Sequence, residues 1–192
     1  FMQEAVPEGE GAIAAIMGIN IEDLNSICLS INNEDMLVEL ANINSSNQIV
    51  ISGTKKAVDI AIQRSSEAGA KRAILLPMSV PAHCKLMKPA SEKFKDVLDS
   101  INLQEPKCSV IQNVDASATN NIVKISENLI SQIYSPVRWT DIMNSFNKLT
   151  LGKCIECGPG KVLSGLMKRT LKNIDIISLD NYESYLNKEY II

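Results

Sequence analysis

The order of apolar segments between residues 11 and 78 restricts the fold more than any other feature of this sequence. Short apolar runs typical of strands alternate with longer stretches whose apolar residues recur at helical spacing. The predicted elements are strand 12–18, helix 21–31, strands 36–43 and 48–53, helix 55–68 and strand 71–78. This βαββαβ order predicts a ferredoxin-like subdomain over residues 11–78.

A different pattern follows residue 78, in which single strands alternate with amphipathic helices. Apolar residues from Leu86 to Ile101 lie on one face of a long helix, with Pro89 near its start, where a missing N–H matters least. The later predicted elements are strand 108–114, helices 124–134 and 139–149, strand 153–157, helix 161–171 and strand 174–179. This alternation predicts a parallel sheet covered by helices, so the fold class is α/β with two subdomains packed together.

Charge and cysteine content exclude several classes of function. The 192 residues carry 19 basic and 22 acidic side chains, a net charge of −3, which is too little positive charge for a nucleic-acid partner. No apolar run approaches the roughly 20 residues that span a bilayer, so we expect no membrane association. Five cysteines, an odd number spread along the chain, do not form a disulfide framework and favour a reducing, cytoplasmic location.

The single histidine, His83, is the strongest candidate for chemistry. It follows a predicted strand at the junction of the two subdomains, and Pro77 and Pro81 stiffen the backbone beside it. A histidine held on such a turn suits a general base, and the alternative is a hydrogen-bonded structural histidine. Cys84 is adjacent, but neighbouring side chains point apart, so we expect no cysteine–histidine dyad. A base without a visible nucleophile suggests that sequence is missing upstream of Phe1.

Two short motifs near the C-terminus resemble binding sites only superficially. Cys154 and Cys157 match C-x-x-C, but no second pair exists, and a strand would send the two thiols to opposite faces. We therefore expect no metal site. The segment 158–161, Gly-Pro-Gly-Lys, lacks the full phosphate-loop pattern and predicts a turn from strand to helix, whose free N–H groups could face an anion.

Several longer stretches match one known family in the family's own order. They are Phe1–Gly9, Gly69–Ala73, Val80–Cys84, Leu86–Ala90, Asn113–Asp115, Tyr134–Thr140 and Gly158–Leu163. On these residues the chain resembles the malonyl-CoA:acyl carrier protein transacylases of bacterial fatty acid synthesis. The resemblance covers the whole chain and is far more specific than any single motif.

The resemblance implies a large α/β-hydrolase-like subdomain with a small ferredoxin-like subdomain inserted into it. Residues 1–10 would be a remnant of the large subdomain, residues 11–78 the insert, and residues 79–192 the C-terminal half of the large subdomain. The family's serine nucleophile, in a G-H-S-L-G elbow, and its carboxylate-binding arginine would lie upstream of Phe1. We therefore expect the 192 residues alone to be inactive.

The same resemblance implies roles for particular residues. His83 matches the catalytic histidine, and Gln132 matches the glutamine whose backbone carbonyl orients that imidazole. Met2 matches a residue near the acyl pocket. Asn44 and Gln48 match an N-x-x-x-Q loop that approaches the thioester, although Ser46-Asn47 replaces the usual Pro-Gly there.

The implied reaction is a ping-pong transfer of malonyl from malonyl-CoA to the phosphopantetheine thiol of acyl carrier protein, without a cofactor. Two alternatives stay open: a catalytically inactive fragment that at most binds a partner, and an enzyme for another acyl group such as acetyl or methylmalonyl. Acyl carrier proteins are acidic, so we expect a basic docking surface at Lys161, Lys168 and Lys172. The alternative is that Lys168 and Lys172 only complement the end of their helix.

Overall fold

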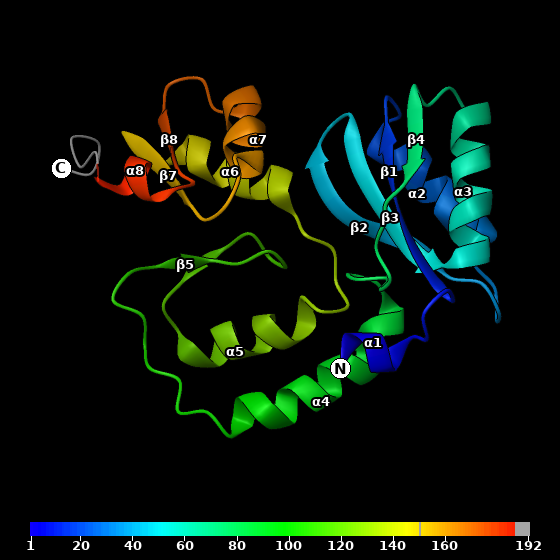
Figure 1. Ribbon diagram of the computed structural model, residues 1–192, viewed down its shortest axis with the longest axis horizontal. Helices are drawn as coiled ribbons and strands as arrows, with labels where there is room; N and C mark the ends of the chain where they lie inside the picture. Colours follow the sequence, from blue (N-terminus) through cyan, green and yellow to red (C-terminus); the bar gives the residue numbers. More distant parts are fainter. Residues whose placement is uncertain (150, 187–192) are drawn as a thin grey trace. The chain divides into compact units, whose positions relative to one another are not determined.

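The computed structural model describes residues 1–149 and 151–186, and the described chain forms two compact units. The first runs from Phe1 to Thr140 and the second begins at Asp141 (Figure 1). Helix α6 (Trp139–Lys148) starts at the end of the first unit. Among the residues described, no helix is long and apolar enough to cross a bilayer.

The first unit contains the predicted ferredoxin-like sheet. Its four antiparallel strands lie in the order β2-β3-β1-β4, and helices α2 and α3 lie on one side of them (Figure 1). The elements are β1 (Gly11–Met17), α2 (Ile21–Ile31), β2 (Val38–Ser45), β3 (Gln48–Thr54), α3 (Lys55–Glu67) and β4 (Arg72–Leu75). The predicted βαββαβ order is therefore confirmed, and the boundaries differ by a few residues at most strand ends.

Strand β1 is buried on both faces of the sheet. Successive side chains of a strand point to opposite faces, so its residues contribute to two apolar clusters. Ala12, Ala14 and Ile16 pack against α2 and α3 in the main apolar core. Ile13 and Ala15 face the other way, into a smaller apolar cluster that also contains Ala82. Ala82, from the sequence after residue 78, and Met2, from the start of the chain, therefore help to cover the second face of this sheet.

A hydrogen bond and a close backbone contact hold the start of β2 against the end of β3. The Thr54 N–H donates to the Leu37 carbonyl at 2.8 Å. A Cβ built on Gly53 would lie 1.9 Å from that carbonyl oxygen and 2.7 Å from the Val38 Cα. Only glycine fits this approach, although the conformation of its backbone is ordinary for a strand.

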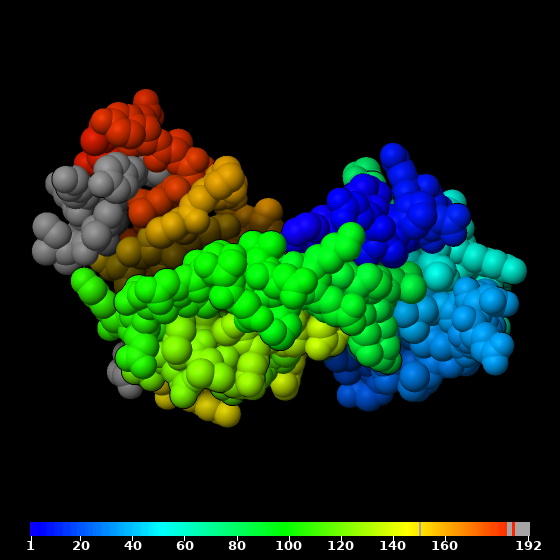
Figure 2. Space-filling model, turned by 90° about the horizontal axis from the view of Figure 1, so that it is seen from below, coloured from blue at the N-terminus to red at the C-terminus, as the bar shows by residue number. Residues whose placement is uncertain are grey.

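The remainder of the first unit contains helices, two short strands and long connecting loops. It comprises α1 (Met2–Ala5), the short 3₁₀ helix η1 (Lys85–Met87), α4 (Lys88–Asp99), β5 (Val110–Ile111), β6 (Ala118–Thr119) and α5 (Ile122–Ser131). Helix α1 lies against α4, as the blue N-terminal segment against the green helix shows in Figure 2. An ion pair of 2.9 Å between Glu4 and Lys93 joins the two.

The strand predicted over residues 108–114 is too long, because the strand in the structure covers only Val110–Ile111. Only β5 forms, and it pairs antiparallel with β6, a strand that the apolar pattern does not predict. A turn stops the strand early, because the Asp115 carboxylate accepts the Ser117 N–H at 3.1 Å and reverses the chain. The predicted parallel arrangement therefore does not extend to this region.

The edge strand β2 is covered by the segment that follows α5. The Val137 N–H donates to Ala41 at 2.8 Å, and its carbonyl accepts the Ile43 N–H at 2.9 Å. These bonds satisfy part of an edge that would otherwise be open to pairing with another chain. They also bring the end of α5 close to the ferredoxin-like sheet.

The second unit contains a β-α-β arrangement. Strands β7 (Lys153–Cys157) and β8 (Asp175–Leu179) pair in parallel, with α7 (Val162–Thr170) between them and α8 (Tyr182–Leu186) after them. The parallel pairing predicted for these strands is confirmed. The α/β fold class is confirmed as well.

Candidate functional site

His83 lies in a tight turn between the ferredoxin-like sheet and the end of α5. On the sheet side, Ala82 packs in the smaller apolar cluster. On the helix side, the His83 N–H donates to the Ile133 carbonyl at 3.1 Å. The backbone of His83 has φ +64°, in the left-handed region that non-glycine residues seldom adopt. Backbone strain of this kind persists only where surrounding contacts hold it.

The imidazole of His83 makes the predicted hydrogen bond to Gln132. Nδ1 lies 2.8 Å from the Gln132 carbonyl oxygen, and the side chain is half-buried. A carbonyl oxygen only accepts, so Nδ1 carries the ring proton. Nε2 of the neutral ring therefore holds a lone pair, which is the form that a general base requires.

The carbonyls that hold His83 belong to the chain just beyond α5. The last carbonyls of a helix have no partner within it, so those of Gln132 and Ile133 are available to other groups. The end of α5 thus orients the imidazole ring.

A buried polar network fixes the position of α5. The Asn128 amide, 3% exposed, donates to Gln112 at 3.0 Å and to Asp115 at 2.9 Å. One turn later, the Asn113 amide donates to the Gln132 side chain at 3.4 Å. The loop after β5 therefore contacts α5 at two successive turns, close to the carbonyls that bind His83.

The pKa of Asp115 is lower than its ordinary value. Partial burial acts to raise this pKa, but hydrogen bonds from the Asn128 amide and the Ser117 N–H, together with the charge of Lys124, outweigh burial. The carboxylate therefore stays ionised and remains an acceptor for Asn128. None of these residues was identified as functional from the sequence, because their proximity depends on the tertiary fold.

Cys84 is unsuited to act as a nucleophile beside His83. Its side chain is fully buried, and the thiol donates to the Pro81 carbonyl at 3.2 Å. Burial raises the pKa of this thiol, which disfavours the reactive thiolate. The prediction that His83 and Cys84 form no dyad agrees with this geometry.

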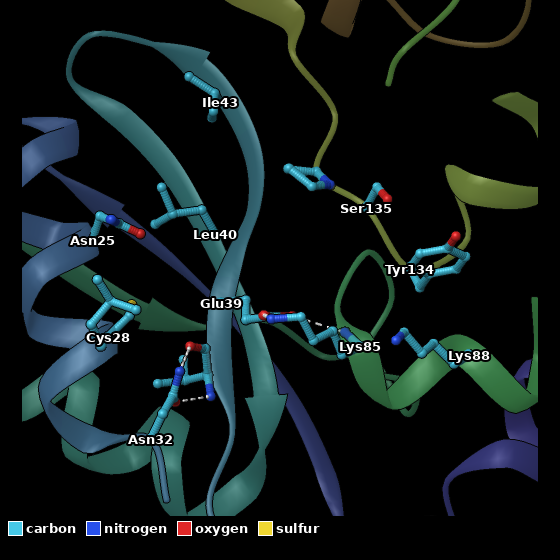
Figure 3. A pocket seen from close by; sticks show the side chains of 13 residues that line it. Asn25, Cys28, Asn32, Glu39, Leu40, Ile43, Lys85, Lys88, Tyr134 and Ser135 are labelled. Carbon is cyan, nitrogen blue, oxygen red and sulfur yellow. Dashed lines mark hydrogen bonds and ion pairs between the residues drawn. The ribbon is translucent and has the colours of Figure 1, made fainter. Parts of the chain in front are cut away.

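Glu39, on the edge strand β2, is joined to the chain just after His83. One carboxylate oxygen accepts the Lys85 backbone N–H at 2.9 Å, and the other accepts the Lys85 ammonium at 2.5 Å. These residues form part of the wall of a cavity of about 460 Å³ (Figure 3). The same cavity is lined by Lys88 and Tyr134, and the Lys88 ammonium lies 6.0 Å from the centre of the Tyr134 ring.

The residues proposed to contact substrate lie on other parts of the first unit. Met2 packs against the same apolar cluster as Ala82, the neighbour of His83. Asn44 is the extra residue of a bulge in β2, and Gln48 begins β3 opposite Met17. The structure thus joins His83 to Gln132 directly and packs Met2 against the cluster that contains Ala82, whereas Asn44 and Gln48 lie at the hairpin end of the sheet.

The predicted basic residues belong to the second unit. Lys161, Lys168 and Lys172 are all exposed, and Lys161 forms an ion pair of 3.3 Å with Asp180. The expectation that the start of α7 has free N–H groups is wrong. The Glu156 carboxylate accepts the N–H groups of Leu163 and Ser164 at 3.0 and 2.7 Å, so the chain's own side chain occupies the position where an anion would bind.

The C-x-x-C motif lies in β7, as predicted. Exposure alternates along the strand, with Cys154 half-buried and Cys157 exposed. Within residues 1–149 and 151–186, no group of three or more histidine, cysteine or acidic side chains is placed to hold a metal ion.

Comparison with known proteins gives a consistent set of relatives. The chain is 46% identical over 184 residues to a malonyl CoA-acyl carrier protein transacylase of Bacillus subtilis, and 43% identical to that of Haemophilus influenzae. The match covers 96% of this chain in both cases, but only 58% and 59% of the two relatives. No family model matches the chain.

Solved structures agree with the sequence relatives. An acyl carrier protein S-malonyltransferase of Vibrio cholerae superposes with a TM-score of 0.91 at 42% identity, over 98% of this chain and 61% of that one. A malonyl-transacylase in complex with a type II PKS acyl-carrier protein gives a TM-score of 0.92 at 39% identity, over 99% of this chain and 61% of that one. The chain is therefore homologous to the malonyl CoA-acyl carrier protein transacylases over nearly all of its own length and about three fifths of theirs.

Proposed function

We propose that this chain supplies the general base of an acyltransferase that moves malonyl from malonyl-CoA to the phosphopantetheine thiol of an acyl carrier protein. The observation that carries the proposal is the hydrogen bond between His83 Nδ1 and the Gln132 carbonyl. It leaves Nε2 as the basic nitrogen of a half-buried ring. Further support comes from the names of the relatives, which include malonyl CoA and acyl carrier protein.

The proposed reaction needs a serine from outside the sequence printed here. His83 Nε2 takes the proton of the serine hydroxyl as its oxygen attacks the thioester carbonyl. The imidazolium then returns the proton to the departing CoA thiolate, which leaves malonyl on serine. In the second half, Nε2 takes the proton of the pantetheine thiol, whose sulfur attacks the ester, and serine recovers its proton. The Gln132 carbonyl stabilises the imidazolium in both halves.

The remaining parts of the proposal concern substrate contacts and organisation. Met2, Asn44 and Gln48 would contact the acyl thioester, supported by the packing of Met2 beside Ala82. We also propose that residues 1–10 and 79–192 belong to one subdomain and residues 11–78 to another. The enzyme would work in the cytoplasm with no cofactor other than the phosphopantetheine of its partner, because serine–histidine acyl transfer requires none.

A transfer assay tests this proposal. The complete natural polypeptide that contains this sequence is mixed with malonyl-CoA and phosphopantetheinylated carrier protein, and the mass of the carrier protein is measured. We expect the carrier protein to gain one malonyl group. Acetyl-CoA and methylmalonyl-CoA serve as competing donors, and faster transfer of either would replace malonyl in the proposal. Absence of transfer from every donor would favour a role in binding alone.

Charge reversal tests the proposed docking surface. In the complete polypeptide, Lys168→Glu with Lys172→Glu should raise the KM for carrier protein several-fold and leave the KM for malonyl-CoA nearly unchanged, because only the partner is a large acidic protein. Lys56→Glu with Lys107→Glu, at two other exposed positions, is the control with the same change of charge. Equal effects of the two pairs would assign Lys168 and Lys172 to their own helix end.

A further inference from the structure

The turn that contains His83 is held at its other end by Glu39. The two residues that interact, Glu39 and Lys85, are 46 positions apart in the sequence. Figure 3 shows the Glu39 side chain reaching from β2 to Lys85, where one oxygen accepts the backbone N–H at 2.9 Å. Lys85 follows His83 by two positions, so this bond fixes the backbone directly after the strained residue.

Both ends of the strained turn are therefore anchored. At the strained residue itself, the His83 N–H donates to the Ile133 carbonyl at 3.1 Å. After it, the Lys85 N–H donates to the Glu39 carboxylate at 2.9 Å. A φ of +64° is unfavourable for a side chain that has a Cβ, so we expect the turn to relax when an anchor is lost. Such a change would move the ring away from the Gln132 carbonyl.

The two hydrogen bonds that Glu39 accepts act on different parts of Lys85: one on its side chain and one on its backbone. The bond to the Lys85 ammonium joins a side chain that is 63% exposed to a carboxylate that is 22% exposed, and exposed ion pairs contribute little. The bond to the backbone N–H acts on the turn itself. A charged acceptor makes this hydrogen bond stronger than one between neutral groups.

We propose that Glu39 is a positioning residue, which keeps His83 in its general-base geometry by binding the Lys85 backbone N–H. The catalytic meaning of this role rests on the proposed function, but the structural claim does not. The proposal predicts that the ring nitrogen of His83 that carries the proton depends on an acceptor at residue 39 and not on the charge of Lys85.

Three variants of the complete polypeptide separate these effects. Glu39→Ala removes both bonds, Glu39→Gln keeps an oxygen that accepts the N–H but removes the charge, and Lys85→Met keeps the backbone bond while removing the ion pair. Long-range ¹H–¹⁵N NMR reports which ring nitrogen of His83 carries the proton. The His83 signal is identified by its disappearance in His83→Gln. This measurement needs no transfer activity, so it is independent of the proposed reaction.

We expect wild type, Glu39→Gln and Lys85→Met to carry the proton on Nδ1. Glu39→Ala should show a mixture with the Nε2–H form, which histidine prefers in water. If the polypeptide is active, kcat of Glu39→Ala should fall about tenfold, as for loss of one charged hydrogen bond, with KM nearly constant. Should Glu39→Ala fail to fold, Glu39→Met, which also lacks an acceptor but keeps most of the side-chain length, takes its place in the same measurement.

Three results would overturn the proposal. A Glu39→Ala protein with the proton still wholly on Nδ1 would show that the anchor is dispensable. A Glu39→Gln protein that changes as much as Glu39→Ala would assign the effect to charge. A Lys85→Met protein with a displaced proton would assign it to the ion pair. If the NMR results are as expected but no transfer occurs, the positioning role stands and the proposed function fails.

Discussion

Replacing His83 with alanine should reduce kcat for malonyl transfer by about 10²–10⁴-fold, the usual contribution of a general base. The loss should fall on kcat more than on KM for malonyl-CoA, because the imidazole acts on the reacting proton rather than on the CoA. The measurement is the initial rate of malonyl transfer to carrier protein by the complete polypeptide. Circular dichroism confirms that the variant remains folded.

Gln132→Ala provides the matched comparison for His83. The bond to His83 comes from the backbone carbonyl of residue 132, which alanine retains. Only the 3.4 Å side-chain contact with Asn113 is lost, so the expected decrease in kcat is less than tenfold. A His83→Ala protein that transfers malonyl as fast as wild type would contradict the assignment of the base. Equal losses in the two variants would show that the Gln132 side chain, and not its carbonyl, is required.

Gly53→Ala should lower the free energy of unfolding by about 3 kcal/mol or more, in the range of severe overpacking. The added methyl group would lie 1.9 Å from the Leu37 carbonyl oxygen, and this neighbour is backbone that cannot rotate away. The expected structural result is a separation of the start of β2 from the end of β3. Urea unfolding followed by circular dichroism measures the change.

Gly165→Ala is the control for the effect of a methyl group alone. Nothing lies within 4 Å of the position that its Cβ would occupy, and the residue is within α7. Alanine at a compatible helix position is worth about 0.5–1 kcal/mol, so this variant should be slightly more stable. A Gly53→Ala protein as stable as wild type would show that the strands can separate without cost.

The sequence predicted the ferredoxin-like sheet because local patterns determine it. The short apolar run of β1 and the helical spacing in α2 and α3 depend only on residues close in sequence. The strand over 108–114 was predicted too long for a corresponding reason. Its apolar residues continue past β5, but the Asp115 side chain binds the Ser117 N–H and reverses the chain. Apolar pattern alone does not show such a turn.

The candidate site was predictable only in part. His83 stood out because it is the single histidine, and the resemblance supplied Gln132 as its partner. Glu39 and Asn128 carried no comparable signal. Their bonds to Lys85 and Gln112 join segments that are distant in sequence, so the contacts arise only when the chain is folded. The occupied N-terminus of α7 was missed likewise, because Glu156 reaches it from a separate strand.

The bond between His83 Nδ1 and the Gln132 carbonyl leaves the neutral imidazole with one nitrogen, Nε2, that can accept a proton. In the proposed reaction, an alcohol and two thiols exchange protons with this one nitrogen, one after another. The two thiols cannot contact that nitrogen together, so the first carrier must leave it before the second arrives. The two acyl carriers would thus have to bind in turn because both need the same nitrogen, and this order requires no movement of the protein.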